Sequence, residues 1–338
     1  MTLDAGGTNF VFSAMQGAQE IVQPIIRESN SAKLEECLKT IINGFKDLLK
    51  SLGTSKPAAI SFAFPGPADY KSGIIGDLPN FPSFRGGVAL GPMLEDIFNL
   101  PTFINNDGDL FTYGEAMGGF LPNLNALLQQ KNINKTYTNL IGITLGTGFG
   151  GGIVVNNQLC QGDNSAAGEI WLTRNYKNSA YMAEEGVSIR AIQRAYSQQT
   201  KSSEVLAPKD IYDIALGKRE GDKNAAEFAF EKTAEVIAES LAHALTLVDG
   251  PVVIGGGISG ASKLILPKIT EILNGTIKNQ DGENIPRLVS KVYDLENSAS
   301  EANFFNWNGN YINVPFNDRK ILYNSEKRIP VGLSLLGT

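Results

Sequence analysis

The sequence predicts an α/β protein of two domains, each with a mixed sheet flanked by helices. Its 338 residues are enough for two domains. Apolar runs typical of strands alternate with helical spacing of apolar residues, which implies crossover connections and parallel or mixed sheets. A glycine-rich hairpin occurs twice, which indicates a duplicated domain with a cleft between the copies. A nucleotide phosphate chain could be held there from both sides.

The two hairpins share one pattern. In the stretch 141–155, an apolar run enters a glycine-dense turn and a β-branched run leaves it. In the stretch 1–14, a short apolar run enters a Gly-Gly-Thr turn and Phe10–Phe12 leaves it. Backbone N–H groups at such bare tips can converge on an anion, because glycine adopts positive φ angles. A single copy fits a purely structural turn equally well, and the second copy favours the phosphate-binding interpretation.

The first half of the chain continues with alternating elements. Helical spacing predicts helices, and short apolar runs bounded by Pro or Gly predict strands. In chain order we expect a helix at 31–49, a strand at 58–64, a helix at 93–98, a strand at 102–105 and a helix at 109–117. Asn106 and Asp107 follow the last of these strands. Ligands of α/β sheets gather at such strand ends.

The second half repeats the pattern. We expect helices at 184–196, 225–248 and 264–273, with a strand at 252–254 that enters a third glycine turn at 255–257. Residues 276–328 are rich in Asn and aromatic residues and show no clear periodicity. They predict an irregular excursion with short strands near 289–293 and 311–315. The last residues, 330–336, predict a short helix.

Composition excludes several classes of protein. The net charge is −6 without a Lys/Arg cluster, which argues against nucleic acid as a partner. Cys37 and Cys160 form no C-x-x-C pair, so a disulfide framework or cysteine zinc site is not expected and a reduced cytoplasm is the expected location. The N-terminus has no basic-then-apolar leader, and no uninterrupted apolar run reaches about 18 residues. The sequence therefore predicts neither a signal peptide nor a membrane segment. Three residues precede Asp4, which is short for a strand and indicates that a few residues are missing from the start.

Five motifs follow one another along the chain: Asp4-x-Gly6-Gly7-Thr8, Asn106-Asp107, Leu145-Gly146-Thr147-Gly148-x-Gly150-Gly151, Ala167-Gly168-Glu169 and Gly255-Gly256-Gly257. Together they resemble the ROK family of bacterial sugar kinases and sugar-responsive repressors, which belongs to the actin-like ATPase superfamily. The resemblance spans about residues 1–275. Each motif is weak alone, and the order of all five is specific.

The resemblance implies two ribonuclease-H-like domains around a deep cleft, with sugar at its floor and Mg-ATP above. The first domain would cover 1–107. The second would cover 108–327, with the irregular excursion at 276–327. A C-terminal helix at about 328–338 could pack back onto the first domain.

The resemblance also implies which residues bind the nucleotide. The first phosphate loop would be Gly6, Gly7, Thr8 and Asn9, and the second Gly146, Thr147 and Gly148. Asp4 would face Mg²⁺ through water, and the adenosine would lie beside Gly255, Gly256 and Gly257. Asn9 stands where many members have Lys.

Six residues match the family's sugar site: Gly66, Asn80, Asn106, Asp107, Glu169 and Glu184. Asp107 would be the catalytic base. Phosphoryl transfer needs an in-line acceptor hydroxyl and a group that takes its proton, and a carboxylate at a strand end meets both needs. The alternative for Asp107 is a cap of the following helix. Trp171 could stack on a sugar face or belong to the core.

The chain departs from the family at the zinc site. Leu172 occupies the place of a family histidine, and no cysteine lies between Cys160 and the C-terminus. The single histidine, His243, lies inside the long predicted helix. We therefore expect no zinc site and the loss of one contact to the anomeric end of the sugar, which leaves substrate identity open.

The leading functional hypothesis is an ATP-dependent kinase for a primary hydroxyl of a hexose, with glucose first and fructose, mannose, allose and N-acetylmannosamine open. The second hypothesis is a sugar-sensing regulator of the same family without catalysis. Regulators carry a helix-turn-helix segment before the first hairpin, and only three residues precede Asp4 here. The expected partner is a small sugar, and a homodimer is left open.

Overall fold

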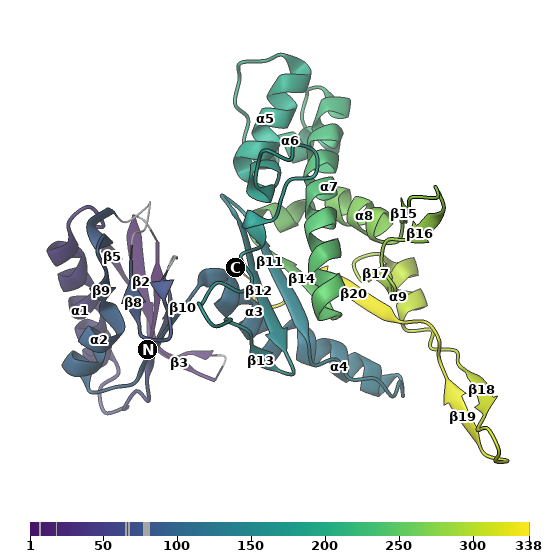
Figure 1. Ribbon diagram of the computed structural model, residues 1–338. Coiled ribbons are helices and arrows are strands. Elements are labelled where there is room, and N and C mark those ends of the chain that lie inside the picture. Colours follow the sequence, from purple (N-terminus) through teal and green to yellow (C-terminus); the bar gives the residue numbers. More distant parts are fainter. Residues whose placement is uncertain (7, 18, 65, 67, 77–81, 338) are drawn as a thin grey trace. The chain divides into compact units, whose positions relative to one another are not determined.

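The computed structural model describes residues 1–338 except 7, 18, 65, 67, 77–81 and 338 (Figure 1). The chain divides into two compact units. The first contains Met1–Leu110 and Gln161–Ala167, and the second contains Phe111–Cys160 and Gly168–Thr338. Helix α3 (Asp107–Met117) therefore begins in the first unit and ends in the second.

The first unit is built on a five-stranded mixed sheet of order β10-β6-β1-β2-β5. β1 and β2 form an antiparallel hairpin, β6 and β10 continue from β1 in parallel, and β5 pairs antiparallel with β2. The bounds are β1 Thr2–Ala5, β2 Asn9–Ser13, β5 Ile25–Glu28, β6 Ile60–Ala63 and β10 Thr102–Asn105. The remaining elements are α1 Leu34–Ser51, α2 Leu90–Phe98, the turn η1 Pro82–Phe84 and the short strands β3 Met15–Gln16, β4 Gln19–Glu20, β7 Ala68–Asp69, β8 Ile74–Ile75 and β9 Val88–Ala89.

Alternation along β2 places phenylalanine side chains in the core of this unit. Phe10 and Phe12 are fully buried, whereas Val11 between them is partly exposed. Helix α1 packs on this strand, and the rings of Phe45 and Phe12 meet edge to face with centroids 5.2 Å apart. Gly44 permits this approach, because a Cβ at that position would lie 2.2 Å from the Phe12 ring.

The second unit is built on a six-stranded mixed sheet of order β13-β12-β11-β14-β20-β17. β11 and β12 form an antiparallel hairpin, β13 pairs antiparallel with β12, and β14, β20 and β17 continue from β11 in parallel. The strand bounds are β11 Leu140–Leu145, β12 Phe149–Val155, β13 Gln158–Leu159, β14 Val252–Gly255, β17 Lys291–Asp294 and β20 Arg328–Leu333. The helices are α4 Phe120–Gln130, α5 Ile189–Thr200, α6 Pro208–Ala215, α7 Lys223–Val248, α8 Ser262–Leu273 and α9 Ser298–Phe304, with the 3-10 turns η2 Ile170–Leu172, η3 Ala183–Gly186 and η4 Gly257–Ala261.

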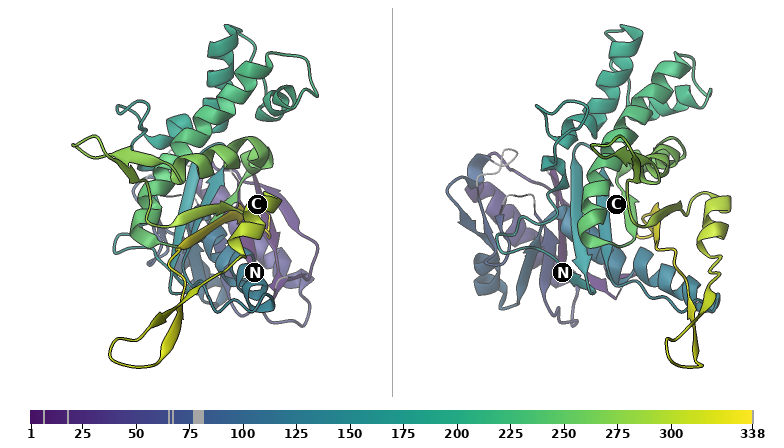
Figure 2. Two further views of the ribbon diagram at one scale, coloured as in Figure 1. Left: turned by 90° about the vertical axis from the view of Figure 1, so that its right-hand side faces the viewer. Right: turned by 45° about the vertical axis from the view of Figure 1, so that its right-hand side comes forward.

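The long helix α7 packs against α5, α6 and α8 and organises the larger core of this unit (Figures 1 and 2). Its N-terminus is capped by Asp222, whose Oδ1 accepts the Ala225 N–H at 3.0 Å. None of the helices in the described part of the chain combines the length and apolar composition that a membrane crossing requires.

The two sheets have the same topology. The strands β5-β2-β1-β6-β10 of the first unit correspond to β13-β12-β11-β14-β20 of the second, in order and in direction. The prediction of an α/β protein with two mixed sheets and a duplicated hairpin is therefore confirmed. The cleft between the two copies stays a prediction.

The predicted C-terminal helix at about 328–338 is wrong, because Arg328–Leu333 forms β20 between β14 and β17. Four consecutive residues, Ile329 to Gly332, are buried, as is typical of a parallel strand covered on both faces. Periodicity cannot distinguish such a short apolar run from a buried helix. This segment belongs to the sheet of the second unit.

Two further predictions need correction. The predicted helix at 184–196 begins only at Ile189, because the Ser188 hydroxyl caps α5 by accepting the Ala191 N–H at 3.3 Å. The region 276–327 is not irregular throughout. It contains the hairpins β15–β16 (Thr276–Lys278, Asn284–Pro286) and β18–β19 (Asn310–Asn313, Lys320–Tyr323) besides β17 and α9.

Candidate functional site

Several predicted site residues of the first unit lie at the carboxyl ends of its parallel strands. Asp4 of β1 lies opposite Ala63 of β6, and Ala63 lies opposite Asn105 of β10. Since these three strands are parallel, Asp4 and the residues that follow Asn105 lie at neighbouring carboxyl ends, where ligands of α/β sheets gather. The Asp4 side chain is exposed there.

Asn106 and Asp107 connect β10 to helix α3. The Gly108 N–H donates to Asn106 Oδ1 and to Asp107 Oδ1, both at 2.8 Å. These bonds orient the two side chains at the first turn of the helix, where the helix dipole favours a negative charge. Asp107 remains exposed, so its carboxylate is accessible to a ligand while it also contacts the helix N-terminus. The capping and catalytic roles are therefore compatible.

Gly66 lies close to Asn106. A Cβ on Gly66 would lie 2.6 Å from the Tyr70 hydroxyl and 3.6 Å from Asn106 Nδ2. The Tyr70 hydroxyl in turn donates to the Phe64 carbonyl at 3.0 Å. Asn80, the other predicted sugar contact of this unit, lies outside the described residues.

The first glycine turn joins β1 to β2. A Cβ on Gly6 would lie 2.8 Å from the Asn9 carbonyl oxygen, so the tight turn requires glycine there. The Thr8 carbonyl accepts the Ser29 N–H at 2.8 Å, which attaches the turn to the end of β5. Thr8 and Asn9 are exposed. Gly7 lies outside the described residues.

The second glycine turn joins β11 to β12 and is supported from behind by the segment that leads into α5. The Gly146 N–H donates to the Gly148 carbonyl at 3.0 Å, and the Ile189 N–H donates to the Gly146 carbonyl at 2.9 Å. Glu184 Oε2 accepts the Phe149 N–H at 3.0 Å. A Cβ on Gly148 would lie 2.6 Å from the same oxygen. The structure therefore places a predicted sugar contact, Glu184, directly against a predicted phosphate loop.

The third glycine turn lies beside the second. β14 runs parallel to β11, with Gly255 opposite Thr144. Gly256 has a φ of +86°, and a Cβ there would lie 2.3 Å from the Leu145 carbonyl oxygen. Only glycine permits this approach of two backbones. The predicted phosphate and adenosine residues of the second unit thus lie at adjacent strand ends.

Glu169 follows Gly168, whose backbone lies close to that of β12. Gly168 has a φ of +82°, and a Cβ there would lie 3.1 Å from the Gly152 Cα. Trp171 Nε1 donates a hydrogen bond to Glu169 Oε2 and orients the half-buried carboxylate. The same segment is joined to η3, since the Ala183 N–H donates to the Thr173 carbonyl at 2.7 Å.

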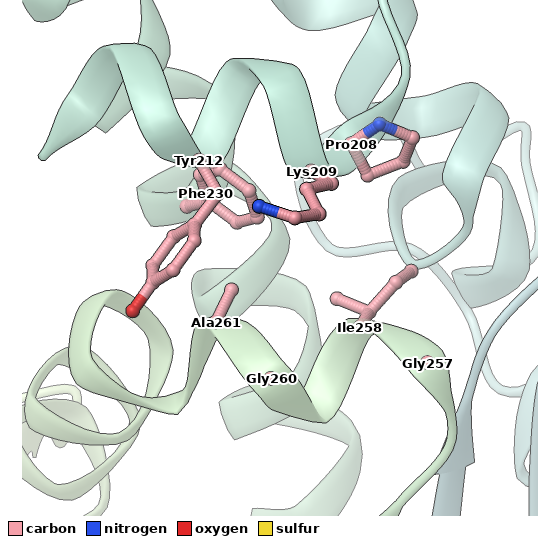
Figure 3. A pocket seen from close by; sticks show the side chains of 8 residues that line it. All are labelled: Pro208, Lys209, Tyr212, Phe230, Gly257, Ile258, Gly260 and Ala261. Atoms are coloured by element: carbon pink, nitrogen blue, oxygen red, sulfur yellow. The ribbon is translucent and has the colours of Figure 1, made fainter. Parts of the chain in front are cut away.

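A cavity of about 270 Å³ opens next to the third glycine turn, between α6, α7 and η4 (Figure 3). Its lining is largely apolar and consists of Pro208, Lys209, Tyr212, Phe230, Gly257, Ile258, Gly260 and Ala261. A concave apolar pocket with aromatic walls suits a flat heterocycle. The sequence analysis did not find the α6 residues of this pocket, although Pro208 at the start of an apolar pattern is a helix start signal.

The site residues form two groups, one in each unit. The first unit carries Asp4, Gly6, Thr8, Asn9, Gly66, Asn106 and Asp107, and the second carries Gly146, Thr147, Gly148, Glu169, Glu184, Gly255, Gly256 and Gly257. Each group is local to its unit. Their assembly into one catalytic centre stays a prediction.

The cysteines and the position of the family histidine bear on whether this chain has a zinc site. Burial raises the pKa of the Cys37 thiol to about 11, so this thiol stays protonated at neutral pH. Leu172, at the place of the family histidine, is 58% exposed. Over the described residues, no group of three or more His, Cys, Asp or Glu side chains is arranged to hold a metal ion.

Comparison with known proteins agrees with this architecture. The ROK family model matches residues 1–300. The crystal structure of a glucokinase from Parabacteroides distasonis is 50% identical, covers 99% of this chain and 92% of that chain, and superposes with a TM-score of 0.90. A glucokinase of Thermotoga maritima is 23% identical over 80% of this chain and 85% of its own. A ROK transcriptional regulator homologous to the E. coli MLC protein shares the fold at 17% identity and a TM-score of 0.66, over 80% of this chain and 68% of that chain.

Two α/β units of common topology, each with a glycine turn at the tip of its first hairpin, define a protein of the actin-like ATPase fold. Within that class, the chain belongs to the ROK family.

Proposed function

We propose that this protein is an ATP-dependent hexose kinase that transfers the γ-phosphate to a primary hydroxyl, with glucose as the preferred acceptor. The observation that carries the proposal is the exposed Asp107 carboxylate at the same sheet edge as Asp4 and the first glycine turn. The glucokinase of Parabacteroides distasonis, half identical over nearly the whole chain, supports glucose as the substrate.

In this proposal the first unit holds the acceptor. Asn106 and Gly66 bound the sugar site, and Asp107 accepts the proton of the attacking hydroxyl. Asp107 suits this role because its carboxylate is exposed and held by the Gly108 N–H at 2.8 Å. A positioned base of this kind contributes about 10²–10⁴-fold to the rate. Glu169 and Glu184 of the second unit would accept hydrogen bonds from other sugar hydroxyls.

The second unit would hold the nucleotide. Gly146 and Gly257 have open space where a Cβ would point, so phosphates and adenosine can approach the backbone. The adenine ring would enter the apolar cavity between Tyr212 and Ile258, next to the third glycine turn. Gly6, Gly7, Thr8 and Asn9 would contact the phosphates from the first unit.

Mg²⁺ would neutralise the charge that develops on the transferred phosphoryl group. Asp4 fits this ion through water, because its carboxylate is exposed near the end of β1, two residues before Gly6. That the protein has no zinc site is a prediction, and it rests on Leu172 at the place of the family histidine. Metal analysis of the purified protein would contradict it by finding one zinc per chain.

A sugar-sensing regulator is the second candidate, because a ROK transcriptional regulator shares the fold. A regulator binds sugar without releasing ADP.

The decisive experiment is an ADP-release assay coupled to NADH oxidation, with glucose, fructose, mannose, allose and N-acetylmannosamine as acceptors. We expect ATP- and Mg²⁺-dependent turnover with the highest kcat/KM for glucose. Turnover with one of the other sugars but not with glucose would show that glucose is not the substrate. Sugar binding by calorimetry without ADP release for any acceptor would favour the regulator.

The cavity beside the third glycine turn gives a separate prediction. Gly260 lines it, and a Cβ there meets no atom within 4 Å. Gly260→Leu should therefore fold normally while its side chain fills part of the cavity. We expect the KM for ATP to rise about tenfold or more, which corresponds to about 1.4 kcal/mol, with the KM for sugar unchanged. An unchanged KM for ATP would show that adenine binds elsewhere.

A further inference from the structure

The hairpin β18–β19 extends away from the sheet and helices of its own unit (Figures 1 and 2). We call residues 308–324 the arm. All eight residues of its two strands are exposed. Six large apolar side chains are exposed on it, from 44% to 110%: Tyr311, Ile312, Phe316, Ile321, Leu322 and Tyr323. The ROK family model ends at residue 300, so the arm lies beyond the part of the chain that matches it.

Contacts of Arg328 hold the base of the arm. The Arg328 guanidinium lies over the rings of Tyr293 and Trp307, at 5.4 Å and 5.2 Å from their centroids. Its Nη1 also donates to the Phe304 carbonyl at 2.6 Å. A two-stranded hairpin is marginal in water by itself. The arm contributes no residue to the described cores, so its exposed apolar side chains are available to another surface.

Each strand of the arm has one free edge, because β18 and β19 pair only with each other, and the edge of β18 is the uncharged one. The Val314 N–H donates to the Arg319 carbonyl at 2.8 Å. Hydrogen-bonded pairs alternate along an antiparallel ladder, so the N–H groups of Tyr311 and Asn313 point away from β19. Proteins usually protect such edges with charged residues. Residues 302–317 contain no Asp, Glu, Lys or Arg, so this edge is unprotected.

The occupant that fits this edge is a second copy of the chain. Each copy carries a net charge of −6, so two copies approach with least repulsion at an uncharged surface. An edge strand is self-complementary when it pairs antiparallel across a two-fold axis, which is the commonest symmetry of oligomers. The six apolar side chains expose on the order of 700 Å² per copy on the two faces and the tip of the arm, which is the most apolar area that this pairing could bury; a standard interface buries about 800 Å² per partner.

We propose that the arm is a dimerisation element in which β18 pairs antiparallel with β18 of a second copy. The two hairpins then form one four-stranded sheet, and the apolar side chains of both arms pack together. This proposal does not depend on the kinase activity.

The test is sedimentation velocity of the full chain over a range of concentrations. We expect wild type to be a dimer and Tyr311→Lys to weaken the dimer at least tenfold, because it places charges of both copies near the two-fold axis. Asn313→Pro should weaken it similarly, since it removes an edge donor without removing a bond to β19. Val289→Lys is the matched control, because Val289 is 89% exposed in the same unit but outside the arm, and it should leave the dimer unchanged.

A monomeric wild type would overturn the proposal and indicate a foreign partner for the arm. A dimer that survives both arm substitutions would also overturn it. Dissociation by Tyr311→Lys but not by Asn313→Pro would overturn the strand pairing and indicate contact through a face of the hairpin. Thermal unfolding of each variant shows that the fold is retained, because the arm contributes no side chain to the described cores.

Discussion

Asp107→Asn is expected to lower kcat for sugar-dependent ADP release by a factor of about 10²–10⁴ while the fold survives. The amide cannot accept the proton of the attacking hydroxyl. Its carbonyl oxygen can still accept the Gly108 N–H, which Asp107 Oδ1 accepts at 2.8 Å, so the start of α3 should be preserved. The measurement is turnover at saturating ATP and sugar, together with the thermal unfolding midpoint.

Asp96→Asn is the matched control for this prediction. Asp96 is an exposed carboxylate on α2 of the same unit, away from the carboxyl ends of the parallel strands. We expect this variant to keep near-normal turnover. Near-normal turnover of Asp107→Asn itself would refute the base assignment and leave Asp107 as a helix-terminal residue only.

Gly256→Ala is expected to destabilise the second unit by about 3 kcal/mol or more. The φ of +86° and ψ of 162° at this position are rarely adopted by residues with a side chain. The new Cβ would also lie 2.3 Å from the Leu145 carbonyl oxygen and 2.5 Å from the Leu145 nitrogen. Since both atoms are backbone, the turn after β11 or β14 must move, and ATP binding should fall with the stability.

Gly257→Ala is the control for replacing a glycine of this turn by alanine without a steric clash. Its Cβ would meet no atom within 4 Å, and its φ is not in the left-handed region. We expect its free energy of unfolding to change by less than about 1 kcal/mol. Chemical denaturation of both variants is the measurement. Equal midpoints for Gly256→Ala and Gly257→Ala would show that the close approach of the two turns is not required for folding.

The sequence was most informative where signals are local. The strand at 102–105 has the predicted bounds, because a short apolar run after Pro101 predicts both its type and its start. The hairpins at residues 1–14 and 141–155 were recognised from glycine flanked by apolar runs. Helices α4 and α6 were not predicted. Strand β20 was mistaken for a helix, since four consecutive buried residues carry no period.

For the candidate site, the order of motifs was sufficient to identify the family, but not to place Glu184. The sequence assigned this residue to a helix, whereas it lies in the turn η3 with Oε2 on the Phe149 N–H. Ser188 ends the turn by capping α5, and this cap lies inside the run that had been predicted as one helix. The aromatic pocket wall from Tyr212 was also missed, because its helix was missed.

The sequence by itself determined the duplicated hairpins, the motif order and therefore the family, because glycine turns and apolar periods act over a few neighbouring residues. Only the tertiary structure decided that Gly256 lies against Leu145 and that Arg328–Leu333 completes the sheet. The physical reason is that strand pairing joins residues far apart in the chain. Burial on both faces and backbone hydrogen bonding select these pairs, and no local pattern encodes them.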